Sequence, residues 1–431
     1  MSKNIIICSD GTGNTFDADQ TNVTRLIQHL ALGNHREQVA VYDQGVGTNA
    51  DRVSEVESFR AGLEGDAALH ILPPPLRSRW PKSSLDRWRG LAFGDGLEQN
   101  IREMYGELSR LYEGPDDKVF LFGFSRGAFT VRALAGLLYR CRLSPRVDRN
   151  PDARFERAWA LYEPMRPADD QKLIADLAEF RKDQRLCGIH FMGLWDTVKS
   201  YGGLKPKLLP HLRHNPIVCH VRHALALHEE RAWFKPTTWG LLNSDAGPDK
   251  ATSRLPEVEW PHYQKQDIAE VWFAGCHSDV GGGKKERDSA TVALRWMIGE
   301  AVNVSPGLIL NDSGRRLLAT PDPLELPRVH RSQRPWWWLL EQVSRTEIDN
   351  DRRWPGTFPA RGSDGMRHPE RSRRGGPVLD SSMTSLGNGK MGVQLKPGGT
   401  VSVHATAKGM HTLQEGIELC ETLPYPVQGR G

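Results

Sequence analysis

The fold is decided by residues 119–127, which read VFLFGFSRG. The four apolar residues at its start are typical of a strand buried on both faces, and helical spacing follows from about Gly127 to Tyr139. Residues 123–127 match G-x-S-x-G, a strand-to-helix turn that lifts a strained serine above the sheet. The stretch therefore predicts a nucleophile elbow with Ser125 as nucleophile. The alternative is a tight turn whose serine has no chemical role.

Apolar runs and helical patterns alternate on both sides of this stretch. We expect further strands at 5–8, 39–42, 188–194 and 269–275, and helices at 21–32, 96–112, 152–162, 169–182 and 288–302. Continuous apolar strands separated by helices indicate a parallel sheet covered on both faces. The sequence therefore predicts an α/β fold of the α/β-hydrolase class, with a mostly parallel sheet, helices on both faces and cap insertions.

The domain organisation follows from where this pattern is interrupted. We expect an α/β-hydrolase catalytic domain over 1–302, with insertions at about 48–92 and 203–262. Both insertions are interpreted as cap or loop material over the active edge, because α/β folds carry function on such loops. The pattern weakens afterwards, so 303–431 is expected to be a C-terminal extension or cap, partly flexible, with a mobile Arg- and Gly-rich loop at 361–377.

Composition excludes several classes of protein. A net charge of +4 over 431 residues and the lack of a recognition motif argue against nucleic-acid binding. Six scattered cysteines without a CxxC pair favour free thiols in a reducing compartment. No apolar stretch approaches the length of a membrane span, and a strand follows the first residues too closely for a signal peptide. We expect a cytoplasmic protein without metal or cofactor, exported, if at all, by a signal-peptide-independent system.

A serine nucleophile requires a base, and the base requires an orienting carboxylate. In this fold class the chain order is serine, acid, histidine, with the last two after later strands. Asp196 follows the strand at 188–194, and His277 follows the strand at 269–275. The sequence thus predicts a triad of Ser125, Asp196 and His277. The alternatives are a helix cap or turn former for the aspartate and a capping or core histidine.

The oxyanion hole is predicted at two backbone positions. One donor is the N–H of Arg126, the residue after the nucleophile. The second comes from the loop after an earlier strand, where Gly11 and Thr12 are the candidates. The alternative for this loop is an ordinary or phosphate-type turn.

Four further residues are expected to support the site. Asp10 would hold the oxyanion loop in shape through bonds to backbone N–H groups. Gly123 and Gly127 flank the serine because a side chain there would collide with neighbouring backbone. Asp279 is a rival acid, but at two residues from the histidine it is expected to shape the loop instead.

A strand followed by Asp-Gly-Thr is also typical of haloacid dehalogenase phosphatases, which use D-x-D-G-T with the first aspartate as nucleophile. Cys8 occupies that position. A cysteine cannot form the aspartyl-phosphate, so this alternative is weak.

Six ordered motifs resemble a known family. They are SDGTGNT at 9–15, TNV at 21–23, YDQGVGT at 42–48, GFSRGA at 123–128, WDTV at 195–198 and HSDVGG at 277–282. Together they are similar to the α/β-hydrolase family that includes type VI secretion system phospholipase effectors, over roughly residues 3–300. The resemblance implies the same triad, metal-free hydrolysis of phospholipid esters, and a secretion-system or immunity partner. The chain departs from the effectors in length, since little follows residue 303 to form a large membrane-docking module.

Two segments are candidates for membrane contact. Residues 335–340 read PWWWLL beside Arg334, which suits a bilayer interface or a lid; the alternative, which we favour, is packing of a cap against the core. The arginines at 361–374 could touch phosphate headgroups, although a solvated loop is the simpler interpretation.

The sequence therefore predicts a serine esterase that cleaves acyl esters, first of all lipids, through an acyl-enzyme. The same groups would serve a thioesterase, a carboxylesterase or a peptidase on soluble substrates. A different class of hypothesis is a non-catalytic binding module that keeps the triad as a relic, for instance beside a secretion system.

Overall fold

The computed structural model describes residues 2–11, 20–45, 68–72, 96–163, 170–198, 209–226, 229, 231, 234, 236–239, 266–273, 275–320, 330 and 332, and the backbone of seven later strands. Thr12, residues 335–340 and residues 361–374 lie outside this part, so their predicted roles stay predictions.

Strands and helices alternate along the chain. The elements up to residue 320 are β1 (Asn4–Ser9), α1 (Asn22–Gln28), β2 (Gln38–Asp43), β3 (Leu69–Ile71), α4 (Leu97–Leu111), β4 (Lys118–Phe124), α5 (Arg126–Cys141), α6 (Pro151–Tyr162), α7 (Gln171–Phe180), β5 (Ile189–Trp195), β6 (Val218–Ala226), β7 (Asp267–Phe273), α9 (His277–Gly281), α10 (Asp288–Asn303) and α11 (Asp312–Ala319). The later strands are β8 (Arg345–Asp349), β9 (Arg352–Gly356), β10 (Leu379–Ser385), β11 (Met391–Leu395), β12 (Gly399–Val403), β13 (His411–Leu413) and β14 (Ile417–Leu419).

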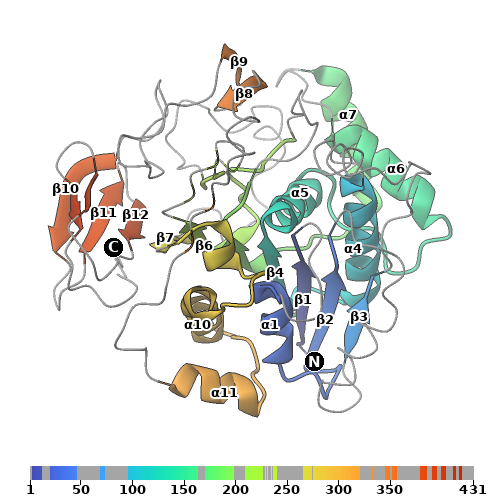
Figure 1. Ribbon diagram of the computed structural model, residues 1–431. Helices are drawn as coiled ribbons and strands as arrows, with labels where there is room; N and C mark the ends of the chain where they lie inside the picture. The colour runs from blue at the N-terminus through green and yellow to red at the C-terminus, as the bar shows by residue number, and fades with distance from the viewer. Residues whose placement is uncertain are drawn as a thin grey trace, which may run out of the picture.

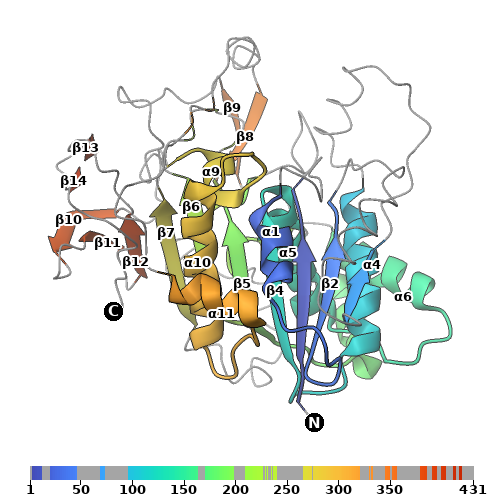
Figure 2. The ribbon, with the colours of Figure 1, turned by 60° about the horizontal axis from the view of Figure 1, so that its bottom comes forward.

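The main sheet in the described part of the chain has the order β10-β11-β12-β7-β6-β5-β4-β1-β2-β3. All neighbours from β12 to β3 are parallel, whereas β10 and β11 are antiparallel additions. Figure 2 shows β1, β5 and β7 pointing toward the end of the sheet where α9 lies. The prediction of a mostly parallel sheet of the α/β-hydrolase class is confirmed.

The direction of strand addition reverses between β1 and β4. From β1 the chain adds β2 and β3 on one side, and from β4 it adds β5, β6 and β7 on the other. The carboxyl ends of β1 and β4 lie side by side, because Ser9 pairs with Gly123. Open α/β sheets place their sites outside the carboxyl ends of the strands at such a reversal. The loop after β1 and the turn after β4 therefore meet at this point.

The apolar core covers both faces of the sheet. Ile5 and Ile7 of β1 belong to a cluster with α4, α5, α6 and α7, whereas Ile6 and Cys8 belong to a cluster with α1 and α10. Figure 1 shows these two groups of helices on opposite sides of the strands. Because both faces are covered, the strands read as continuous apolar runs rather than as alternating patterns.

Both predicted insertions contain strands of the sheet, which corrects their interpretation as cap or loop material. β3 lies within 48–92, and β6 lies within 203–262, between β5 and β7. The sequence of β6 was misleading because it contains His220, Arg222 and His223. Polar contacts with acidic side chains, including an ion pair between Arg222 and Glu300, allow these residues to lie within the sheet. The division of the chain near residue 302 stays a prediction.

The described helices are too short to cross a membrane. The longest, α5 and α10, have 16 residues each, whereas a span needs about 20 apolar residues. None of the helices in the described ranges has the required length and hydropathy.

Candidate active site

Ser125 lies at a sharp turn between β4 and α5. Its φ of 58° and ψ of −118° are uncommon for a residue with a side chain. The Ser125 N–H donates to the carbonyl of Trp195 at 3.0 Å, which ties the turn to β5. The residue is 8% exposed. The turn thus has the form of the predicted nucleophile elbow, with a buried serine at the carboxyl end of β4.

The two glycines beside the serine are required by close backbone contacts. A Cβ on Gly123 would lie 2.6 Å from the Cα of Ala128, and a Cβ on Gly127 would lie 2.0 Å from the carbonyl oxygen of Ser9. Both distances are far below any van der Waals contact. The absence of side chains therefore lets α5 begin directly over β4 and against the loop that follows β1.

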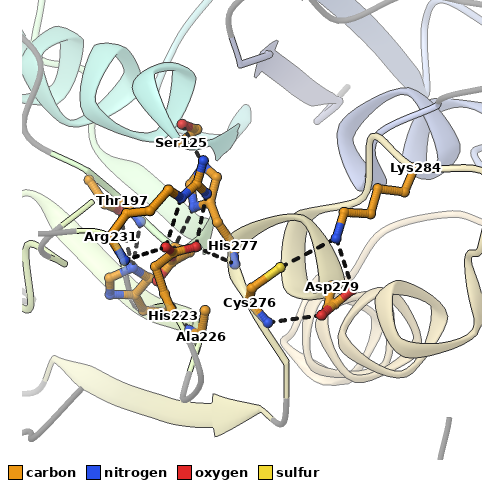
Figure 3. Close-up of polar contacts among 11 residues, drawn as sticks. Ser125, Thr197, His223, Ala226, Arg231, Cys276, His277, Asp279 and Lys284 are labelled. Atoms are coloured by element: carbon orange, nitrogen blue, oxygen red, sulfur yellow. Dashed lines mark hydrogen bonds and ion pairs between the residues drawn. The ribbon is translucent and has the colours of Figure 1, made fainter. Parts of the chain in front are cut away.

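The structure brings together the three predicted triad residues, which come from three different parts of the chain. The Nε2 atom of His277 lies 2.8 Å from the Oγ of Ser125, and its Nδ1 lies 2.6 Å from Oδ2 of Asp196. Figure 3 shows the imidazole directly below Ser125. A base must lie within hydrogen-bond reach of its nucleophile and of an orienting group. This arrangement meets both conditions.

Asp196 is fully buried after the end of β5 and has a φ of 40°. Its Oδ1 accepts the backbone N–H of Ala226 at 3.1 Å, so both carboxylate oxygens have partners. Because an ionised carboxylate only accepts hydrogen bonds, Nδ1 of His277 must carry a proton. In the neutral imidazole, Nε2 then presents its lone pair to the Ser125 hydroxyl.

The environment of His277 favours its neutral form. Burial lowers the pKa of the imidazole below its ordinary value, with a smaller contribution in the same direction from the charge of Arg231; the hydrogen bond and charge of Asp196 act in the opposite direction. The histidine can thus accept a proton from the serine at neutral pH. Asp196 would then stabilise the imidazolium that forms.

Two phenylalanine rings pack against the imidazole. Phe124, the last residue of β4, has its ring centroid 4.6 Å from that of His277, and Phe234 packs edge-on at 4.9 Å. These contacts restrict the ring to the plane in which both of its nitrogens have partners.

Asp279 bonds the loop around His277. Its Oδ2 accepts the backbone N–H of Cys276 at 2.9 Å and the N–H of His330 at 2.8 Å, while Oδ1 lies 2.6 Å from Nδ1 of His330. Asp196 occupies the position beside the imidazole. Asp279 therefore contacts the loop around the histidine and not its imidazole, and its loop-shaping role stays a prediction.

The loop after β1 is organised around Asp10. Its carboxylate accepts hydrogen bonds from the N–H of Gly11 at 2.6 Å, the hydroxyl of Thr21 at 2.6 Å and the hydroxyl of Tyr42 at 2.9 Å. Because the Gly11 N–H is engaged by Asp10, it would have to change partner to donate to an oxyanion. Arg126 begins α5, so its N–H points toward the N-terminal end of that helix.

The motif at 21–23 connects α1 to the histidine loop. Thr21 forms a β-bridge with Gly282, and the Asn22 side chain donates to the carbonyl oxygens of Val280 at 2.9 Å and Ala290 at 2.7 Å. Asn22 is fully buried. The motif therefore fixes the segment that follows His277 against the rest of the fold.

Sequence reasoning missed two groups of buried charged residues. Glu229 accepts the backbone N–H of His277 at 3.1 Å and is paired with Arg231. Behind Asp196, the Nδ1 of His223 lies 2.8 Å from Glu270, and its Nε2 accepts the N–H of Thr197 at 3.2 Å. The sequence offered only a run of charges at 229–231 and histidines in an apparent insertion, which are also typical of solvated loops.

The described part of the chain contains no group of three His, Cys, Asp or Glu side chains that could hold a metal ion. The cysteines within it are free thiols, as expected.

Comparisons with known proteins agree with this architecture. A family model described as "T6SS, Phospholipase effector Tle1-like, catalytic domain" matches residues 3–300. The uncharacterized protein YEL023C of Saccharomyces cerevisiae is 33% identical over 242 residues, which are 54% of this chain and 32% of that protein.

Solved structures are more distant. An uncharacterized protein from Pseudomonas aeruginosa is 18% identical with a TM-score of 0.38, over 74% of this chain and 48% of that one. The Tle1 effector bound to the VgrG spike of the Type 6 secretion system is 15% identical with a TM-score of 0.29, over 66% and 51% of the two chains. The RedJ thioesterase of prodiginine biosynthesis in Streptomyces coelicolor is 16% identical with a TM-score of 0.23, over 68% and 90%.

The chain spans only 32% of the length of the yeast relative and 48% of the Pseudomonas protein. The family assignment therefore concerns the catalytic domain and rests on the match over residues 3–300. It confirms the resemblance that the six ordered motifs indicated. The chain belongs to the family of type VI secretion system Tle1-like phospholipase effector catalytic domains.

Proposed function

We propose that this chain hydrolyses acyl esters, with Ser125 as nucleophile, His277 as general base and Asp196 as the orienting carboxylate. The observation that carries the proposal is the unbroken hydrogen-bond series from the Ser125 hydroxyl through both nitrogens of His277 to a buried carboxylate. Residues packed for structure alone have no need of a strained serine at the end of that series.

The reaction would proceed through an acyl-enzyme. As Ser125 Oγ attacks the ester carbonyl, its proton passes to Nε2 of His277. The tetrahedral oxyanion is stabilised by the N–H of Arg126 and by a second donor from the loop of Gly11 and Thr12. The intermediate collapses and expels the alcohol, which takes the proton from His277. Water, activated by the same histidine, then releases the carboxylic acid and frees Ser125.

The substrate class that we propose is the phospholipid. The support is membership of a family whose description names phospholipase effectors. Cleavage would release a fatty acid and leave a lysophospholipid. By the same family relation we propose a type VI secretion system as partner, an immunity protein as a second partner, and export from the cytoplasm by that system.

The test is hydrolysis of phospholipid vesicles, followed by mass spectrometry of the lipid products. The wild-type protein should release fatty acid, and Ser125→Ala, shown by circular dichroism to be folded, should not. Short soluble acyl esters and thioesters form a second arm that separates a lipase from an esterase or thioesterase. Absence of hydrolysis in both arms by folded wild-type protein would favour the binding-module alternative.

A further inference from the structure

Beside the triad lies an ion pair between a buried carboxylate, Glu229, and a partly buried guanidinium, Arg231. Glu229 is 2% exposed. The guanidinium of Arg231 contacts both of its carboxylate oxygens: Nε lies 2.8 Å from Oε1, and Nη2 lies 2.9 Å from Oε2. The backbone N–H of Arg231 also donates to Oε1 at 2.8 Å. A bidentate pair of this kind fixes the carboxylate in orientation as well as in position.

The ion pair reaches the catalytic histidine by two routes. Glu229 Oε2 accepts the backbone N–H of His277 at 3.1 Å. The guanidinium of Arg231 stacks on the Phe234 ring with Cζ 3.6 Å from its centroid, and that ring packs edge-on against the imidazole. Figure 3 shows Arg231 on the side of His277 away from Asp279. One route holds the backbone of the histidine, and the other holds the face of its ring.

We propose that Glu229 and Arg231 are positioning residues for His277, Glu229 by holding its backbone and Arg231 by holding both Glu229 and the Phe234 ring in place. This inference rests on the proposed function, because it assigns a role in the same proton transfer. Ordinary loop anchoring would require neither a carboxylate on the N–H of the base nor a guanidinium that reaches the same imidazole through an aromatic ring.

The pair is also balanced in charge. Among the described residues, the charged groups with the largest effect on the imidazole are Asp196, Arg231 and Glu229; the carboxylates raise the pKa of His277 and the guanidinium lowers it. Asp279, on the same loop as the histidine, faces Cys276 and His330 instead. Loss of one member of the pair would thus leave the charge of the other uncompensated close to the base.

This balance predicts opposite effects for two neutralising variants. Arg231→Gln leaves the negative charge of Glu229, which favours the imidazolium, so the acidic limb of the pH–rate profile should move to higher pH. Glu229→Gln keeps an amide oxygen for the His277 N–H but leaves the positive charge of Arg231, so the limb should move to lower pH. Each displacement should be about one pH unit.

The experiment measures the second-order rate of Ser125 modification by a fluorophosphonate as a function of pH, on folded full-length protein. Arg231→Lys is the conservative variant: it keeps the charge, so its acidic limb should coincide with that of the wild type, but it loses the bidentate grip and the rate should fall several-fold. The matched control is Glu300→Gln in another buried pair, where Glu300 Oε2 lies 2.5 Å from Arg222 Nε. It should lower stability without moving the limb.

Opposite displacements of the acidic limb in Arg231→Gln and Glu229→Gln would support the positioning role of the pair. An acidic limb in both variants that equals the wild-type limb would overturn it. If Arg231→Gln does not fold, Glu229→Gln and Arg231→Lys still decide, because the first must move the limb to lower pH and the second must leave it in place. Failure of wild-type Ser125 to react at any pH would instead contradict the proposed function, so the two failures are distinguishable.

Discussion

The described part of the chain has two buried histidine–carboxylate pairs within one region, and the main difference between them is the partner of the histidine Nε2. In both, Nδ1 faces a carboxylate: His277 lies 2.6 Å from Asp196, and His223 lies 2.8 Å from Glu270. The Nε2 of His277 lies against the hydroxyl of a strained serine, whereas the Nε2 of His223 accepts a backbone N–H from Thr197. Burial lowers the pKa of both rings.

A buried histidine with a carboxylate is therefore not sufficient to identify a base. The lone pair on Nε2 of His223 accepts a hydrogen bond from a backbone N–H, and the ring has no exposed surface. The Nε2 of His277 instead faces the Ser125 hydroxyl, a group that can react. The same dyad thus stabilises the fold in one place and, in our proposal, performs chemistry in the other. Its second partner decides between the two roles.

The largest expected effect comes from the hydroxyls that face the two histidines. Ser125→Ala should lower kcat/KM by at least about 10⁴-fold, because the nucleophile is lost. Thr197→Val, which removes a hydroxyl 3.2 Å from Nε2 of His223, should stay within about tenfold, as expected for one hydrogen bond. Steady-state kinetics on a soluble acyl ester measures both. Equal losses in the two variants would erase the distinction between the pairs.

The next largest difference in activity is expected between variants of the two carboxylates, Asp196 and Glu270. Asp196→Asn should lower kcat by about 10⁴-fold, because an amide permits the wrong tautomer of the base. Glu270→Gln keeps an oxygen for Nδ1 of His223 and for the N–H of Trp239, which Glu270 accepts at 2.7 Å, so activity should fall only a few-fold. Rates are compared at a saturating concentration of the same ester. A mild effect of Asp196→Asn would contradict its orienting role.

The pH dependence of the wild-type enzyme should show the lowered pKa of His277. The base acts in its neutral form, so activity rises as pH rises through this pKa. Since burial lowers the pKa from the ordinary value of 6.5, the acidic limb of kcat/KM should lie below pH 6.5. A limb clearly above that value would mean that the imidazole is not held in the buried position.

The smallest effect on rate should come from the second histidine itself. His223→Ala deprives the Thr197 N–H and Glu270 of a buried partner, so the free energy of unfolding should fall by about 1–3 kcal/mol. Urea denaturation measures this loss of stability, and the kcat of the folded fraction shows whether the rate also changes. A collapse of kcat without a loss of stability would place His223 in the chemistry.

The elements that the sequence predicted share a local cause. The nucleophile turn could be recognised because an apolar strand, two glycines and a helix follow one another within residues 119–139. Asp196 and His277 could be predicted because the carboxyl ends of parallel strands meet at one edge of a sheet. The structure places both within hydrogen-bond distance of their expected neighbours.

The features that were missed depend on long-range partners. β6 did not look like a buried strand because Arg222 and His223 are polar, and their burial depends on partners on other elements, among them Glu300 on α10 and Glu270 on β7. Glu229 and Arg231 likewise belong to a short run of charged residues, which in sequence is typical of a solvent-exposed loop. Whether a charge is buried depends on what neutralises it, and that neighbour can lie 78 residues away, as for Arg222 and Glu300. No periodicity in one sequence contains this information.

The most direct test of the central claim is covalent labelling with a fluorophosphonate, with the modified residue identified by peptide mass spectrometry. The wild-type protein should carry one adduct on Ser125. His277→Ala should react orders of magnitude more slowly, and folded His223→Ala should react nearly as fast as the wild type. A folded wild-type protein without an adduct at Ser125, or a His277→Ala variant labelled at the wild-type rate, would contradict the account.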